Sequence, residues 1–252
     1  MSIELARFDA FAFDLDGVVT NTAAVHAAAW KRAFDELLEG LANGKPWQPF
    51  DLDREYRAHV DGKPRRDGIR SLLESRGISL SEGKPGDGPE APTIHGLAER
   101  KNRYLREQLR STRVEVHEDA VVLLHEARSC RVRVAVVSSS ENCSAVLVSA
   151  RVFDLFDVRV DGLDSARLGL RGKPAPDTFL EAARRLGAEP RRVVVFEDAI
   201  AGVRAGRAGD FGLVIGVDRV GHAEALRRAG ADVIVTSLAE LELTRGRAVV
   251  HP

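Results

Sequence analysis

The chain is poor in cysteine, methionine, tryptophan and tyrosine, and it has no surplus of either charge. Its 252 residues contain 2 cysteines, 1 methionine, 2 tryptophans and 2 tyrosines. Cys130 and Cys143 are too few for a disulfide framework or a four-cysteine zinc site, so we expect reduced thiols. The 37 basic and 38 acidic residues give a net charge of −1, without the basic surplus of a general nucleic-acid binder.

Long apolar runs are also missing. No run approaches the roughly 20 residues of a membrane-spanning helix, and residues 1–8 lack the basic start and apolar stretch of a secretory signal. We therefore expect a cytoplasmic protein that binds neither membrane nor nucleic acid. What is present, 44% hydrophobic and 30% charged residues, is typical of a globular protein.

Apolar runs alternate with helical stretches in the second half of the chain. This pattern predicts an α/β fold, a Rossmann-like parallel sheet flanked by helices. The expected strands are 8–14, 132–137, 193–196, 211–217 and 232–235, and the expected helices are 118–128, 175–186, 199–208 and 223–229.

A long, mostly helical stretch separates the first strand from the others. It predicts a helix over 22–41, capped by Asn21 or Thr20, and three further helices over 53–59, 68–76 and 94–110. Residues 81–93 are rich in glycine and proline and predict a loop. We expect a discontinuous core domain, residues 1–20 and 113–252, with a helical cap domain over residues 21–112.

Polar side chains follow three of the predicted strands, and ligands of parallel sheets bind beyond the carboxyl ends of the strands. The residues in question are Asp14, Asp16, Ser138, Ser139, Ser140, Glu197 and Asp198, joined by Lys173 in a Gly-Lys-Pro turn. Clustered carboxylates need a cation, and oxygen ligands suit Mg²⁺. Serines and a lysine suit a phosphate, and one carboxylate could attack phosphorus while another handles a proton. Each motif alone could equally be a turn or a helix cap.

Taken together, these motifs resemble those of the haloacid dehalogenase superfamily. The matching segments are Asp-Leu-Asp-Gly-Val-Val-Thr from Asp14, then Ser138, Lys173-Pro174 and Glu197-Asp198. The resemblance implies that Asp14 is the nucleophile and Asp16 the general acid/base. It also implies Mg²⁺ ligands and phosphate-binding residues: Asp14, the Asp16 carbonyl and Asp198 for the metal, with Glu197 in or near its shell, and Ser138, Ser139 and Lys173 for phosphate.

The inserted segment resembles the cap of the β-phosphoglucomutase-like family. Thr22, His26 and Trp30 recur at four-residue spacing and can face one cleft. The resemblance assigns further substrate contacts to the cap and the core: Gly62, Lys63, Arg65, Lys101, Asn102, Ser140 and Asn142.

By this resemblance we expect a monomeric, Mg²⁺-dependent isomerase that interconverts β-D-glucose 1-phosphate and glucose 6-phosphate. The expected intermediates are an aspartyl-phosphate and a glucose 1,6-bisphosphate, which also activates the enzyme. A sugar-phosphate phosphatase and a non-catalytic sugar-phosphate-binding module are the alternatives. Asn21 stands where the mutases usually have aspartate, and Glu141 where they have lysine. These departures leave the hexose and its anomer open.

Overall fold

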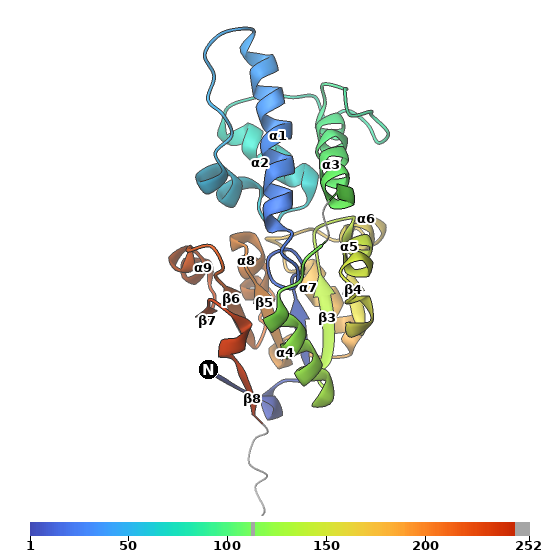
Figure 1. The fold of residues 1–252 in the computed structure, drawn as a ribbon, viewed down its shortest axis with the longest axis vertical. Coiled ribbons are helices and arrows are strands. Elements are labelled where there is room, and N and C mark those ends of the chain that lie inside the picture. The colour runs from blue at the N-terminus through green and yellow to red at the C-terminus, as the bar shows by residue number, and fades with distance from the viewer. Residues whose placement is uncertain (112–113, 245–252) are drawn as a thin grey trace, which may run out of the picture. The chain divides into compact units, whose positions relative to one another are not determined.

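A computed structural model describes residues 1–111 and 114–244 of the chain (Figure 1). The chain forms two compact units, one of Met1–Asn21 with Val116–Pro252 and the other of Thr22–Glu115. The boundary expected at residue 113 lies outside the described residues. Within the described part of the chain, no helix is both long enough and apolar enough to cross a membrane.

The first unit, called the core unit below, is built on a six-stranded sheet in the order β4-β3-β2-β5-β6-β7. All neighbouring strands in this sheet are parallel, which confirms the predicted fold class. The strands are β2 (Ala10–Phe13), β3 (Arg133–Val137), β4 (Val158–Val160), β5 (Val193–Glu197), β6 (Leu213–Val217) and β7 (Val233–Val235). A separate parallel pair joins β1 (Ser2–Glu4) to β8 (Glu242–Thr244).

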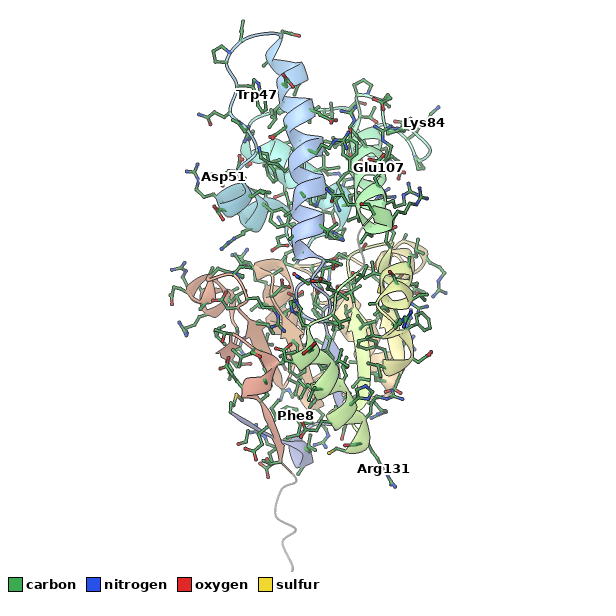
Figure 2. All side chains as sticks on the ribbon, in the orientation of Figure 1. Phe8, Trp47, Asp51, Lys84, Glu107 and Arg131 are labelled. Atoms are coloured by element: carbon green, nitrogen blue, oxygen red, sulfur yellow. The ribbon has the colours of Figure 1, made fainter. Side chains whose placement is uncertain are left out.

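The helices of the core unit lie between the strands along the chain, and α4, α7, α8 and α9 pack against the sheet (Figure 1). They are α4 (Glu118–Ser129), α5 (Cys143–Ser149), α6 (Gly162–Leu168), α7 (Asp177–Leu186), α8 (Ile200–Ala208) and α9 (Ala223–Ala229). Every residue of β2 is buried, because that strand lies between β3 and β5 and is covered by helices. Phe8 and Arg131, labelled in Figure 2, lie near the starts of β2 and β3, at the opposite end of these strands from the polar residues discussed below.

Several short elements of the core unit were not predicted. β4 has three residues with a charged one, Arg159, in the middle, and it forms an edge of the sheet, so no apolar run marks it. β1, β8, α5 and α6 are also too short for a periodic signal.

Asp119, in the first turn of α4, binds the segment that follows β7 and the loop that follows β6. Its carboxylate accepts hydrogen bonds from Ser237 Oγ (2.6 Å), Leu238 N (2.8 Å) and the Arg219 guanidinium (2.9 and 3.1 Å). Burial raises the pKa of Asp119, but these hydrogen bonds outweigh burial and lower the pKa to about 2. Ionised Asp119 therefore stabilises the folded chain above about pH 4, and this contribution is lost as the pH falls towards 2.

We expect Asp119→Asn to lower the free energy of unfolding by about 2 kcal/mol at pH 7. The difference from the wild-type protein should shrink as the pH falls from about 4 to about 2. Urea unfolding at a series of pH values measures it. A difference that stays constant over this pH range would contradict the role given to the ionised carboxylate.

The second unit, called the insert unit below, is helical. It contains α1 (Ala23–Ala42), a π-helical segment η2 (Leu52–Val60), α2 (Arg65–Ser75) and α3 (Ile94–Ser111). Its core lies between these helices and includes the stacked rings of Trp30 and Phe34. The predicted capping of the first helix was wrong: Thr22 occupies the N-cap position, and its side chain makes no capping hydrogen bond.

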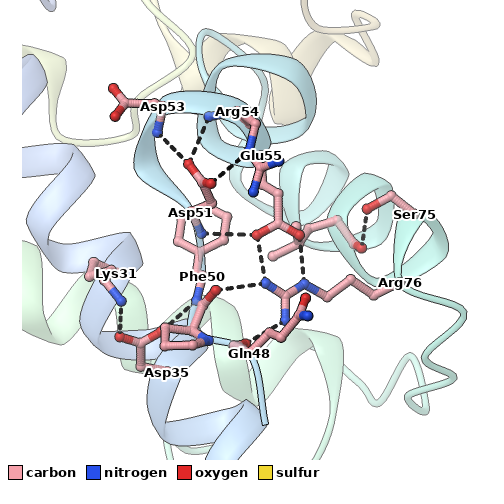
Figure 3. Close-up of polar contacts among 12 residues, drawn as sticks. Lys31, Asp35, Gln48, Phe50, Asp51, Asp53, Arg54, Glu55, Ser75 and Arg76 are labelled. Carbon is pink, nitrogen blue, oxygen red and sulfur yellow. Dashed lines mark hydrogen bonds and ion pairs between the residues drawn. The ribbon is translucent and has the colours of Figure 1, made fainter.

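An arginine holds the irregular segment between α1 and η2 (Figure 3). Arg76 forms two 2.6 Å contacts with Glu55 and donates to the carbonyl oxygens of Gln48 (2.8 Å) and Pro49 (3.0 Å). Asp35 on α1 accepts a hydrogen bond from Phe50 N at 2.8 Å. These contacts fix a loop that the prolines and glycine of the sequence leave without regular structure.

Candidate active site

The polar residues that follow β2, β3 and β5 lie at one edge of the sheet. Phe13, the last residue of β2, pairs with Val136 of β3 and Phe196 of β5, so the three strands end within one residue of one another. Asp14 N donates to the Phe196 carbonyl at 2.9 Å, which holds Asp14 directly beyond the strand. Asp14, Ser138 and Glu197 are all buried.

Lys173, in the loop before α7, joins two of these strand ends. It is 1% exposed, and its ammonium group donates to Asp14 Oδ1, to Glu197 Oε1 (2.5 Å) and to the Val137 carbonyl (3.3 Å). Burial works to lower the pKa of Lys173, but the carboxylates of Asp14 and Glu197 outweigh burial and raise the pKa. The lysine is therefore a fixed positive charge beside Asp14.

Glu197 uses both of its carboxylate oxygens inside the protein. Oε1 accepts from Lys173, and Oε2 accepts from Ala199 N at 2.7 Å. The side chain lies over Gly202 of α8, where an added Cβ would be 1.7 Å from Oε1. The predicted metal residue Glu197 thus orients Lys173 in this structure.

We expect Gly202→Ala to displace Glu197, lower the free energy of unfolding by about 1–3 kcal/mol and reduce the activity that depends on Lys173. Gly40→Ala is the matched control, because Gly40 lies in helix α1 with open space where its Cβ would be. Thermal unfolding of both variants measures the effect. The packing account is wrong if Gly202→Ala is as stable as Gly40→Ala.

The loop after Asp14 turns sharply at Gly17, whose φ is +96°. Gly17 N donates to the Thr20 carbonyl at 2.7 Å, and Thr20 Oγ1 donates to the Leu15 carbonyl at 3.1 Å. The Asp198 carboxylate lies against Gly17, since an added Cβ there would be 1.9 Å from Asp198 Oδ2. Asp198 therefore lies beside the turn that carries Asp16.

Ser138 lies next to this turn, and its Oγ is 3.5 Å from Asp16 Oδ2. The Ser138 and Ser140 hydroxyls accept from the backbone N of Ser140 (3.1 Å) and Asn142 (3.2 Å), which orders the loop from Ser138 through Ser139 to Asn142. Gly162, after the unpredicted β4, packs against this loop: an added Cβ would lie 2.9 Å from the Ser139 carbonyl oxygen. The loop is thus a preformed turn with hydroxyls at the sheet edge.

Negative charge accumulates at this edge. Burial raises the pKa of Asp14 well above its usual range, the carboxylates of Glu197 and Asp16 raise it further, and Lys173 opposes them. In the described part of the chain, no group of three or more His, Cys, Asp or Glu side chains could hold a metal ion by itself. A hard cation that accepts carbonyl oxygen and water beside two carboxylates, as Mg²⁺ does, fits the donors present.

The insert unit brings three of the predicted substrate residues, Lys101, His26 and Trp30, together. Lys101 Nζ on α3 is 3.2 Å from His26 Nδ1 on α1 and 5.0 Å from the centre of the Trp30 ring. Lys101 is only 2% exposed, and its neighbour Asn102 is also buried. Thr22, at the start of α1, is buried as well.

The other predicted residues of the insert unit lie at the start of α2. Gly62 has a φ of +71° in the turn before the helix, and Lys63 Nζ donates to Ser71 Oγ at 2.9 Å. Arg65 Nη1 is 3.6 Å from Glu99 Oε1 on α3, and the Arg65 side chain is 13% exposed. Sequence reasoning missed Glu99, because nothing in the local pattern pairs it with an arginine 34 residues earlier in the chain.

The fold and the site define a class of protein. It is a parallel α/β protein that carries carboxylates, a lysine and hydroxyls at the carboxyl edge of its sheet. A model of the haloacid dehalogenase-like hydrolase family matches residues 8–210. The chain belongs to this family, within its β-phosphoglucomutase-like branch, which confirms the resemblance seen in the sequence.

Named relatives include both a mutase and a phosphatase. The chain is 46% identical over 234 residues to a "Beta-phosphoglucomutase" of Mycobacterium tuberculosis, covering 91% of this chain and 89% of that protein. It is 30% identical to a "Phosphorylated carbohydrates phosphatase" of Thermotoga maritima, with 90% and 94% covered. The crystal structure of a Clostridium difficile β-phosphoglucomutase, 26% identical, superposes with a TM-score of 0.70 and covers 93% of this chain and 93% of that chain.

Proposed function

We propose that the chain is a Mg²⁺-dependent hexose-phosphate mutase that interconverts β-D-glucose 1-phosphate and glucose 6-phosphate. The observation that carries the proposal is the buried Asp14 carboxylate, fixed by Lys173 and flanked by Asp16 and Asp198. This arrangement suits an oxygen nucleophile that attacks phosphorus. The 46% identity to a protein named β-phosphoglucomutase supports the mutase assignment.

The proposed reaction runs through Asp14. Its carboxylate oxygen attacks phosphorus, the bond from phosphorus to the sugar oxygen breaks, and the Asp16 carboxyl group gives that oxygen a proton. In the reverse sense, Asp16 takes the proton of a sugar hydroxyl, which then accepts the phosphoryl group from Asp14. A sugar 1,6-bisphosphate therefore links the two monophosphates and is the activator that first loads Asp14.

The remaining groups at the sheet edge hold the phosphoryl oxygens. Lys173 neutralises charge, and Ser138 and Ser139 offer hydroxyl or backbone donors. The carboxylates of Asp14 and Asp198 and the carbonyl of Asp16 would hold Mg²⁺, which supplies further positive charge to the phosphate. Each of these groups belongs to the core unit.

In this proposal the insert unit is a cap that recognises the sugar and its second phosphate. His26, Trp30, Lys101 and Asn102 contact the sugar phosphate from the insert, and Ser140 and Asn142 do so from the core. A buried lysine beside a histidine offers donors to an anionic, hydroxyl-rich ligand. Arg65 would bind the phosphate that is not being transferred, with Gly62 and Lys63 shaping its turn.

Phosphatase activity is the second candidate, and the Thermotoga maritima relative favours it. A phosphatase would share the Asp14 chemistry, with water in place of the sugar hydroxyl. It would not require a second phosphate-binding arginine.

An assay over a panel of hexose 1-phosphates, in both anomers, tests the proposal. Each is incubated with the protein, Mg²⁺ and a trace of the matching 1,6-bisphosphate, and hexose 6-phosphate is measured. We expect β-glucose 1-phosphate to give the fastest formation. The substrate assignment fails if another sugar or the α anomer is isomerised faster.

Arg65→Ala separates the two activities. We expect it to slow isomerisation about a hundredfold, as loss of a charge-assisted contact worth about 2–3 kcal/mol would do, with little effect on hydrolysis of a small aryl phosphate. Arg66→Ala is the control, because Arg66 is the exposed neighbouring arginine. Equal losses of both activities in Arg65→Ala would show that Arg65 does not bind the second phosphate.

A further inference from the structure

The loop between β6 and α9 contacts both the turn at Gly17 and the backbone of Asp198. Asp218, just after β6, organises this loop: its carboxylate accepts hydrogen bonds from the backbone N of Gly221 (2.7 Å), His222 (2.8 Å) and Ala223 (2.8 Å). Asp218 is 7% exposed. The loop is therefore rigidly built, and it presents Arg219 and His222.

Arg219 holds the turn that follows Asp16. Its Nε donates to the Gly17 carbonyl at 3.1 Å, and its terminal nitrogens donate to Asp119 at 2.9 and 3.1 Å. The side chains of Arg219 and Asp119 are 18% and 13% exposed, so solvent screens the pair only weakly. Ser237 and Leu238 in turn donate hydrogen bonds to Asp119, so the carboxylate that binds the Arg219 guanidinium is itself fixed in position.

The direction of the Asp16 carbonyl follows from these contacts. In a trans peptide the carbonyl of one residue points opposite to the N–H of the next. Gly17 N–H is fixed on the Thr20 carbonyl, and the Gly17 carbonyl is fixed on Arg219. The Asp16 carbonyl belongs to the same peptide group as the Gly17 N–H, so these hydrogen bonds fix the direction in which it points.

His222 holds the backbone of Asp198. Its Nε2 is 2.8 Å from the Asp198 carbonyl oxygen, which can only accept, so Nε2 donates. The Asp198 carboxylate lies against Gly17. The loop between β6 and α9 therefore holds the backbone of both residues of this contact, Gly17 through Arg219 and Asp198 through His222.

We propose that Arg219 and His222 are positioning residues that hold the Asp16 carbonyl and Asp198 at the separation a divalent cation requires. The inference rests on the Mg²⁺ site of the proposed function and adds two residues that carry none of its chemistry. Groups that orient metal ligands change metal affinity by roughly 10–100-fold when they are removed. Affinity for Mg²⁺, rather than turnover at saturating Mg²⁺, is the quantity these residues should control.

The test is calorimetric titration of the chelator-stripped full chain with MgCl₂. We expect Arg219→Ala and His222→Leu each to raise the Kd for Mg²⁺ at least tenfold, and kcat at saturating Mg²⁺ to fall much less. His222→Gln keeps a donor at a similar reach and Arg219→Lys keeps a charge, so both should recover part of the affinity. Arg191→Ala is the control, because Arg191 forms an exposed ion pair with Asp210 in the same unit.

A Kd that stays at the wild-type value while the melting temperature falls would overturn the inference, because the residues would then be merely structural. So would a wild-type chain that binds no Mg²⁺. If the wild-type chain binds Mg²⁺ and the variants weaken binding, but no hexose phosphate is isomerised, the inference stands and the mutase proposal fails.

Discussion

Replacing Asp14 by asparagine should abolish phosphoryl transfer while leaving the fold intact. Asparagine has nearly the same shape but lacks the nucleophilic oxygen, and losing a covalent nucleophile costs on the order of 10⁴–10⁶ in kcat. The amide oxygen of asparagine can still accept a hydrogen bond from Lys173, and Lys173 keeps the Glu197 carboxylate as its partner, so we expect the variant to fold. Initial rates together with thermal unfolding measure both effects.

Asp9→Asn is the matched control for this variant. Asp9 precedes the same strand, β2, at its other end, and forms a partly exposed pair with Arg192. Such pairs contribute little, so this variant should keep its turnover. Retained turnover in Asp14→Asn, for isomerisation or for hydrolysis, would remove Asp14 from the role of nucleophile.

Replacing Lys173 by methionine should have the largest effect on stability. It leaves the buried carboxylates of Asp14 and Glu197 without their shared cation, and removing one partner of a buried ion pair costs about 3–5 kcal/mol. Turnover should be lost as well, because the phosphoryl oxygens lose a fixed positive charge. Urea unfolding in the absence of Mg²⁺ measures the stability of the chain itself.

A double variant makes the electrostatic cause testable. Adding Asp14→Asn to Lys173→Met removes one of the two uncompensated carboxylates, so part of the lost stability should return. Lys84→Met, at an exposed loop lysine, controls for the change of side chain. If the single variant is as stable as wild type, or if the second substitution restores nothing, the buried charges are not what Lys173 compensates.

The sequence predicted the strands that carry the site because each is a continuous apolar run that ends in acids or serines. β2, β3 and β5 are of this kind, and their shared edge follows from the rule for parallel sheets. β4 could not be predicted in this way, since Arg159 interrupts its three residues, and Gly162 was therefore missed.

Contacts between residues far apart in the chain could not be predicted from local sequence patterns. Lys173 was expected near phosphate, but its bonds to Asp14 and Glu197 depend on how the loop before α7 folds back to the sheet. Arg219 and His222 carry no motif at all, because their partners are backbone carbonyls, which every sequence has. The roles given to the site residues by resemblance stay predictions until the variants are measured.

The fate of phosphate is the most direct test of the central claim, that the phosphoryl group moves between sugar oxygens by way of Asp14. A time course by ³¹P NMR would follow β-glucose 1-phosphate with Mg²⁺ and a trace of glucose 1,6-bisphosphate. The account predicts that the glucose 1-phosphate signal is replaced by glucose 6-phosphate while total organic phosphate is conserved. Inorganic phosphate that accumulates as fast as glucose 1-phosphate disappears, without glucose 6-phosphate, would contradict it.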